Sequence, residues 1–264
     1  MEIAIYQIDA FTSRLFAGNP AAVCPLERWL PDEVMQAIAA ENNLAETAFF
    51  VPKDGDAGRA AFGLRWFTPT VEVPLCGHAT LATGFVIATI LAPGTENMRF
   101  ETRSGPLEVT RRGDLFVLDF PARPPEPVAT PPALSAALGL APREVLAASS
   151  YLAVFADEAE VAALAPDMAA IAALDRDGVI ATAAGREVDF VSRYFAPAAG
   201  IPEDPVTGSA HCILTPYWAK RLGRSSLHAR QISTRGGELF CEDHGARVTI
   251  AGRAVRYLEG RIFV

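Results

Sequence analysis

Apolar and polar residues alternate along several short stretches of the chain, with the period of two that is typical of strands with one buried face. Such strands are predicted at residues 3–10, 21–25, 47–51, 63–67, 98–102, 107–111 and 115–120. The last three are separated by the turn sequences Ser104-Gly105 and Arg112-Gly113-Asp114. Such short turns favour antiparallel pairing of the strands that they connect.

Two helices are predicted among these strands. Residues 31–42 are amphipathic and begin with proline, whose missing N–H costs least at a helix start. Residues 77–90 are almost continuously apolar and predict a buried helix. The most apolar run, residues 79–92, is too short to cross about 30 Å of hydrocarbon, and it contains three threonines and a glycine.

The second part of the chain repeats this plan. Strands are predicted at residues 151–156, 179–181 and 188–195, a helix at residues 207–222, and further strands from there to residue 264. Alanine-rich helices are predicted around residues 133–138 and 157–173.

Three short motifs occur twice and in the same order, which indicates an internal duplication. Residues 65–69 (RWFTP) match 193–197 (RYFAP) at an offset of 128, residues 75–80 (LCGHAT) match 206–211 (VTGSAH) at 131, and residues 102–107 (TRSGPL) match 234–239 (TRGGEL) at 132. A boundary is expected within residues 121–127, where four prolines prevent a regular element. The sequence therefore predicts an α+β protein of two pseudo-symmetric domains, 1–120 and 121–264, each a mostly antiparallel sheet wrapped around a central helix.

The composition of the chain argues against several classes of function. Half of the 264 residues are apolar, so the chain can bury a large core. A net charge of −8 disfavours a nucleic-acid partner, since phosphate-binding surfaces are normally basic. The four cysteines lack the close paired spacing of zinc or redox sites. Because the N-terminus also lacks the pattern of a signal peptide, we expect a cytoplasmic protein with no membrane partner.

Gly77 and Gly208 occupy matching places at the starts of the two central helices. Unpaired N–H groups and the positive end of the helix dipole make a helix start suitable for an anion, and glycine allows close approach. Each glycine alone could serve only a tight turn. Their symmetric placement favours two facing helix N-termini that bind a small anionic metabolite in an inter-domain cleft.

Three residues are candidates for catalysis. Glu46 begins an apolar strand, where burial is expected to raise its pKa toward neutrality and suit it to proton transfer; the alternative is a surface glutamate. His78 and Asp204 lie beside the two helix starts, although His78 could merely bond a carbonyl and Asp204 could serve a turn or cap. Thr207 or Ser209 could cap the second helix. The four histidines show no spacing typical of metal sites, so no metal is expected.

Five motifs together resemble the PhzF-like phenazine biosynthesis family. They are residues 19–23 (NPAAV), 43–49 (NLAETAF), 67–69 (FTP), 75–80 (LCGHAT) and 203–211 (EDPVTGSAH). The resemblance spans nearly the whole chain. It implies the diaminopimelate-epimerase-like fold, commonly a homodimer, and an isomerase that needs no metal or coenzyme.

The resemblance also implies residue roles. In the phenazine enzyme itself, the glutamate matched by Glu46 moves a proton in isomerising a dihydro-hydroxyanthranilate. The residues matched by His78, Asp204 and Ser209 line the pocket there. Gly77 and Gly208 match glycines that present backbone N–H groups, and Asn19 matches a further residue near the site.

Two other functions remain open. Related epimerases use two opposed cysteines, and Cys76 fits the first position while Thr207 replaces the second. A two-thiol racemase is therefore disfavoured, but a one-base dehydratase or epimerase using Cys76 stays possible, since the helix dipole could lower the pKa of this thiol. The other class is a non-catalytic protein that only holds a small acid.

Overall fold

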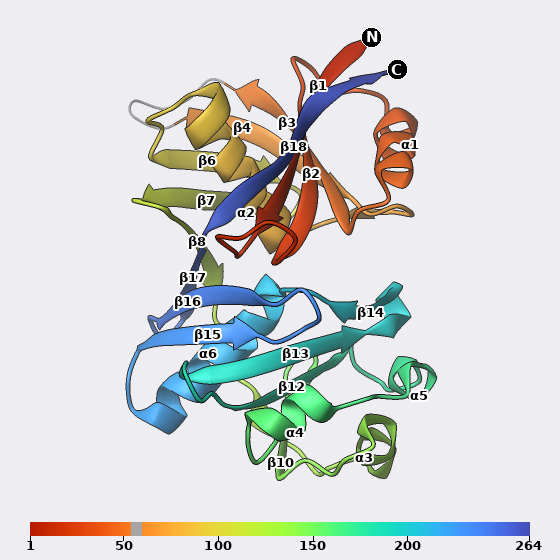
Figure 1. Cartoon of the computed structure of the whole chain (residues 1–264), viewed down its shortest axis with the longest axis vertical. Helices are drawn as coiled ribbons and strands as arrows, with labels where there is room; N and C mark the ends of the chain where they lie inside the picture. Colours follow the sequence, from red (N-terminus) through yellow and green to blue (C-terminus); the bar gives the residue numbers. More distant parts are fainter. Residues whose placement is uncertain (54–59) are drawn as a thin grey trace. The chain divides into compact units, whose positions relative to one another are not determined.

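The computed structural model describes residues 1–53 and 60–264, and the chain divides into two compact units (Figure 1). The first unit is Met1–Asp119 together with Ala251–Val264, and the second is Phe120–Ile250. The expectation that all residues from 121 to 264 form the second half is therefore wrong for the last segment. Strand β18 (Ala254–Phe263) returns to the first unit because it pairs antiparallel along the whole of β1 (Glu2–Ala10).

The first unit is a mostly antiparallel sheet with two helices. Its other strands are β2 (Asn19–Pro25), β3 (Glu46–Lys53), β4 (Ala60–Phe67), β5 (Glu72–Val73), β6 (Asn97–Thr102), β7 (Gly105–Arg112) and β8 (Leu115–Pro121). Its helices are α1 (Asp32–Asn42) and α2 (Gly77–Val86), and α2 continues as a π-helical turn, η1 (Ile87–Leu91). Helix α2 packs against β1, β2, β3, β7 and β18, so it is the central helix that the sequence predicts.

The second unit has its own sheet and helices. Its strands are β9 (Glu126–Pro127), β10 (Glu144–Ala147), β11 (Tyr151–Val154), β12 (Val179–Ala184), β13 (Phe190–Ala196), β14 (Ile201–Asp204), β15 (Ser226–Gln231), β16 (Gly237–Asp243) and β17 (Arg247–Gly252). Its helices are α3 (Pro132–Leu138), α4 (Glu158–Ala163), α5 (Met168–Ala172) and α6 (Gly208–Leu222), with one 3₁₀ turn, η2 (Pro197–Ala199).

The two sheets share one topology. In the first unit, β1–β2, β3–β4 and β6–β7 pair antiparallel, while β2–β3 and β4–β6 pair parallel. In the second unit, β10, β11, β12, β13, β15 and β16 repeat this alternation in the same order. The pairing pattern confirms an α+β chain built from two similar halves.

Equivalent side chains make equivalent ion pairs in the two units. Arg65 binds Glu72 through two N–H···O contacts of 2.8 and 2.7 Å, and Arg193 binds Glu203 through two of 2.7 and 2.9 Å. Two parallel contacts fix the planar guanidinium against the carboxylate. The duplicated motifs therefore correspond to duplicated packing.

Local chemistry explains where the elements differ from expectation. The helical region predicted at residues 157–173 is two short helices, α4 and α5, because Pro166 between them cannot donate a helical N–H. The proline-rich boundary does carry a short strand, β9, which pairs with β10, a strand not foreseen. None of the helices in the described ranges is long and apolar enough to cross a bilayer.

The alternation of side chains along β3 directs its first residue toward α2. Phe49 and Val51 belong to a core cluster with Met35 and Ile38 of α1. Successive side chains of a strand point to opposite faces. Glu46, an odd number of residues from both, therefore lies on the other face of the sheet.

Candidate functional site

The start of β3 and the start of α2 meet in the first unit. Cys76 is the N-cap residue of α2, and His78 is its second helical residue. Because α2 packs against β2 and β3, these two side chains reach the face on which Glu46 lies. The three residues are almost wholly buried, with exposed fractions of 9% for Glu46 and 6% for each of the others.

These three side chains are in direct contact. Glu46 Oε2 lies 3.1 Å from His78 Nε2, and Cys76 Sγ lies 3.5 Å from His78 Nδ1. Within the described residues, neither Glu46 Oε2 nor His78 Nε2 has a hydrogen-bond partner of normal geometry, so their contact is an ion-pair contact rather than an aligned hydrogen bond. Buried polar atoms usually have such partners, and those without one are common at functional sites.

The expected rise in the pKa of Glu46 is wrong. Burial does raise the pKa, but the charge of His78 and the contacts from His78 and Cys76 more than offset it, so the pKa lies below its ordinary value. Glu46 is therefore a carboxylate at neutral pH. Proximity to a cation outweighs desolvation here.

The pKa values of His78 and Cys76 follow from the same arrangement. Burial lowers the pKa of His78, but its contacts with Cys76 and Glu46 raise the pKa by more than burial lowers it. The net pKa of His78 is therefore well above its ordinary value. Burial first, and the charge of Glu46 second, raise the pKa of Cys76 to about 11. The expectation that the helix dipole lowers the pKa of Cys76 is thus wrong. The site holds a carboxylate, an imidazolium and a neutral thiol.

The same three residues could supply metal ligands. Their donor atoms all lie within 4.8 Å of one another, a grouping that spacing in the sequence did not reveal. A metal ion needs a deprotonated thiol and a neutral imidazole. With the pKa values of Cys76 and His78 both raised, an ion would have to displace two protons. Metal independence stays a prediction.

Two further candidates lie beside this cluster. Asn19 is the first residue of β2 and is fully buried. In the parallel pairing of β2 with β3, Ala21 is opposite Glu46, so Asn19 is two positions away along the neighbouring strand. Gly77 is the first residue of α2, between Cys76 and His78.

The second unit gathers its own candidates at the start of α6. Asp204 ends β14, Gly208 begins α6, and Ser209 follows with an exposed side chain. Thr207 Oγ1 donates to Asp204 Oδ2 at 2.6 Å. Thr207 does not cap α6 with its side chain, because its hydroxyl is engaged by Asp204 instead.

The two central helices begin without a side-chain cap at the N-cap position. Neither Cys76 nor Thr207 accepts a hydrogen bond from its helix. By contrast, Asp157 and Asp167 cap α4 and α5. The first N–H groups of α2 and α6 are therefore not satisfied by the N-cap side chain, which suits them to an anion.

The sequence matches the family described as phenazine biosynthesis-like protein over residues 8–260. The chain belongs to this family. An uncharacterized isomerase of Pseudomonas aeruginosa is 55% identical over 262 residues, which cover 99% of each chain. The crystal structure of a PhzF-family phenazine biosynthesis protein from Enterococcus faecalis matches with a TM-score of 0.96 and 48% identity over all of both chains.

The fold of this chain is also similar to that of an epimerase with little sequence identity. A hydroxyproline epimerase from Agrobacterium vitis matches with a TM-score of 0.62 and 12% identity, over 99% of this chain and 92% of that one. The diaminopimelate-epimerase-like fold that the motifs imply is thus confirmed. The relatives named as isomerases support isomerase activity in general.

The sequence assigned no role to three polar residues that contact Cys76 or Thr207. Thr80 Oγ1 donates to the carbonyl of Cys76 at 2.6 Å, and His211 Nδ1 donates to the carbonyl of Thr207 at 2.8 Å. Thr80 and His211 correspond at the repeat offset, which could have paired them. Gln231, which contacts Thr207, belongs to no motif and gave no such signal.

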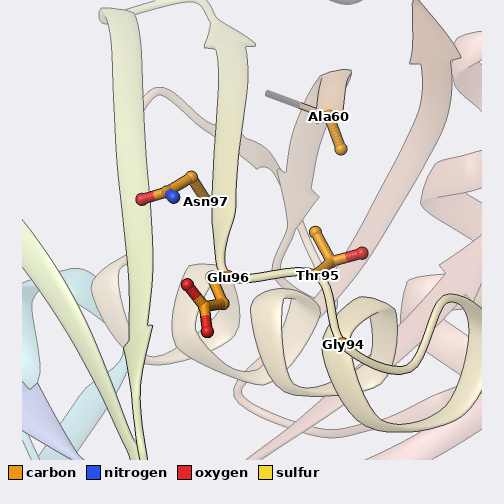
Figure 2. A pocket seen from close by; sticks show the side chains of 5 residues that line it. All are labelled: Ala60, Gly94, Thr95, Glu96 and Asn97. Carbon is orange, nitrogen blue, oxygen red and sulfur yellow. The ribbon is translucent and has the colours of Figure 1, made fainter. Parts of the chain in front are cut away.

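The pocket shown in Figure 2 lies elsewhere in the first unit. Ala60, Gly94, Thr95, Glu96 and Asn97 line it. Ala60 begins β4, whereas Phe67 at the other end of β4 is opposite Thr47, beside Glu46. Seven residues of strand separate the two ends by roughly 20 Å, so this pocket is not part of the Glu46 cluster.

Proposed function

We propose that this chain is an isomerase that moves a proton on a small carboxylate-bearing substrate without metal or coenzyme, with Glu46 as the base. The observation that carries the proposal is the buried contact of 3.1 Å between Glu46 and His78 at the start of α2. Because Glu46 is ionised at neutral pH, it can accept a proton from a substrate that is bound beside it.

The proposed reaction needs only this chain's groups. Glu46 accepts a proton from one carbon of the substrate and returns it to another, so the residue ends as it began. The positive charge of His78 keeps Glu46 ionised between turnovers. Backbone N–H groups at the start of α2 stabilise negative charge that develops on the substrate.

The second unit is proposed to bind and orient. The uncapped start of α6, with Gly208 and the exposed Ser209, suits a carboxylate. Asp204 is proposed to orient a polar group of the substrate. That both helix starts serve one cleft stays a prediction, as does the homodimer, which light scattering would test.

The alternative base is Cys76, in a dehydratase-like elimination or an epimerisation. Its pKa of about 11 disfavours this, because little thiolate exists at neutral pH. The alternative from another class is a binding protein without catalysis. It needs helix starts for the anion but gains nothing from a buried acid–base pair.

Deuterium incorporation from heavy water tests the proposal. The assay would follow a dihydro-hydroxyanthranilate and a panel of small acids that includes trans-4-hydroxy-L-proline. Glu46→Gln keeps the volume but removes the base, so exchange should fall by about 10²–10⁴-fold, the usual contribution of a general base. Glu101→Gln, on an exposed glutamate of β6, is the matched control and should leave exchange unchanged. Exchange that persists in Glu46→Gln would exclude Glu46 as the base, and a wild-type protein that binds these acids but neither exchanges nor isomerises them would be a binding protein.

A further inference from the structure

Gln231 is a fully buried polar residue at the end of β15, close to the start of α6. A buried carboxamide is costly unless its oxygen and both N–H groups find partners. All of the partners found for this side chain lie in the segment just before α6. Gln231 therefore holds the segment from which α6 begins.

The carboxamide of Gln231 connects Thr207 and Asp204 through three contacts. Its oxygen accepts from the Thr207 N–H at 2.9 Å, and its NH₂ group donates to the Asp204 carbonyl at 2.7 Å and to Thr207 Oγ1 at 3.1 Å. Thr207 Oγ1 in turn donates to Asp204 Oδ2. The orientation of the amide is fixed, because reversing it would place two donors face to face.

This set of contacts determines how α6 begins. Thr207 is the N-cap residue, so contacts with its backbone N–H and its hydroxyl fix the Val206–Thr207 peptide and the Thr207 side chain, directly before the first helical residue, Gly208. The N–H groups of the first turn then keep one direction before any ligand arrives. Such preorganisation lowers the cost of binding.

The internal duplication is broken at this position. Ser104 Oγ donates to the carbonyl of Pro74 at 2.8 Å, and Ser233 Oγ donates to that of Pro205 at 2.8 Å, so the two serines are equivalent. Thr102 and Gln231 end the equivalent strands β6 and β15 and pair with the first residues of the next strands, Gly105 and Gly237. The strands therefore match Thr102 with Gln231, and not with Thr234 as the motif alone indicated. Thr102 Oγ1 donates to Gly105 in its own turn instead. The three contacts that the Gln231 amide makes with Thr207 and Asp204 therefore have no counterpart at Thr102.

We propose that Gln231 is a positioning residue that holds the α6 N-terminus in the geometry with which it binds a substrate carboxylate. The inference rests on the proposed function, in which the start of α6 takes the carboxylate. Gln231 does not touch the substrate. It acts through Thr207 and through the loop that carries Asp204.

Titration with benzoate, followed by NMR of the backbone amides, tests this on the full chain. The amides of residues 208–210 should shift and saturate in the wild type. Gln231→Met keeps the length of the side chain but removes all three hydrogen bonds. Benzoate affinity should then fall by about tenfold or more, since a misplaced binding group and unpaired buried polar atoms both weaken binding.

Thr182→Val is the matched control. Thr182 is also fully buried in the second unit, where its hydroxyl donates to the Val191 carbonyl and accepts from Trp218 Nε1. This variant should lose stability in the same way but keep benzoate affinity within about twofold. Equal losses of affinity in both variants would reduce Gln231 to a structural role and overturn the proposal.

A second variant reports on geometry without a ligand. Gln231→Glu keeps an oxygen that accepts from the Thr207 N–H, so hydrogen exchange at that amide should stay slow, whereas Gln231→Met should accelerate it. A carboxylate at this place should still weaken benzoate binding by charge repulsion. Slow Thr207 exchange in Gln231→Met, or benzoate affinity within twofold of wild type in both variants, would contradict the proposal. So would wild-type amides at residues 208–210 that do not respond to benzoate.

The test of Gln231 can succeed or fail independently of the test of Glu46 as the base. The assignment of the base is measured by deuterium exchange, whereas the role of Gln231 is measured by benzoate affinity and by hydrogen exchange at the Thr207 amide. If catalysis survived in Glu46→Gln while Gln231→Met still lost benzoate affinity, the assignment of the base would fail and the role of Gln231 would stand.

Discussion

Glu46 and His78 approach each other to 3.1 Å between Oε2 and Nε2, and both are almost fully buried, so they titrate as a coupled pair. His78 lowers the pKa of Glu46, and Glu46 raises that of His78. The doubly charged form of the pair therefore persists over a wide range of pH. Activity that depends on it should fall in acid as Glu46 is protonated and in alkali as His78 loses its proton.

His78→Asn should move the acid limb of this profile to higher pH. Without the imidazolium, burial becomes the dominant influence and raises the pKa of Glu46. The alkaline limb due to His78 should vanish. The measurement is deuterium exchange as a function of pH, in wild type and variant. An acid limb at the same pH in both proteins would show that His78 does not control the ionisation of Glu46.

Cys76→Ser should retain deuterium exchange within about tenfold of the wild type. The thiol, with a pKa of about 11, is protonated at neutral pH, and a hydroxyl can replace it as a hydrogen-bonding neighbour. The comparison uses the same acids as for Glu46→Gln. Should exchange vanish in Cys76→Ser but continue in Glu46→Gln, the thiol is the base and the dehydratase-like function replaces the one proposed.

Treatment with a chelator should leave exchange unchanged. A metal ion at Glu46, Cys76 and His78 would have to displace protons from two groups whose pKa values are raised. The assay compares protein dialysed against EDTA with protein supplied with Zn²⁺ or Mg²⁺. Activity lost to EDTA and restored by a divalent ion would contradict metal independence.

His211→Thr should make the stability of the fold less dependent on pH. Burial lowers the pKa of His211 from 6.5 to about 4. Between these values the unfolded chain binds a proton that the folded chain does not. The contribution of neutral His211 to the free energy of unfolding is thus fully present above pH 6.5. It is lost as pH falls, by up to about 3 kcal/mol near pH 4.

Threonine is the natural replacement for His211, because Thr80 makes the same bond to a carbonyl in the first unit. Urea unfolding of both proteins between pH 4.5 and 7 gives the free energy of unfolding. The difference between wild type and variant should change with pH in the stated direction. A constant difference would mean that His211 is not neutral in the folded state.

The duplication made much of this fold predictable. The paired motifs located both central helices, and the alternating stretches located most strands, because burial on one face of a strand or helix leaves a period in the sequence. What lay outside that period was missed. β10 is a short strand whose residues Val145, Leu146 and Ala147 are all buried, so it shows no alternation. The return of β18 depends on pairing with β1 across the whole chain, which no local pattern encodes.

The sequence predicted which residues belong to the candidate site, but it did not predict the direction of their pKa shifts. Motifs identified Glu46 and His78 separately, yet the pKa of Glu46 depends on a histidine that is distant in sequence and close in space. Considering Glu46 alone, desolvation indicated the wrong direction. Gln231 shows the same limit, since its role follows only from the three contacts that it makes with Thr207 and Asp204.

The return of β18 has a consequence for folding during synthesis. The ribosome completes the second unit, Phe120–Ile250, before it makes Ala251–Val264. Until that last segment emerges, β1 pairs on one side only, with β2. The second unit can therefore fold while the unit that carries Glu46 still waits for its final strand. Nascent chains released before residue 251 should consequently contain a protease-resistant second unit and a first unit with an open sheet edge, prone to aggregation.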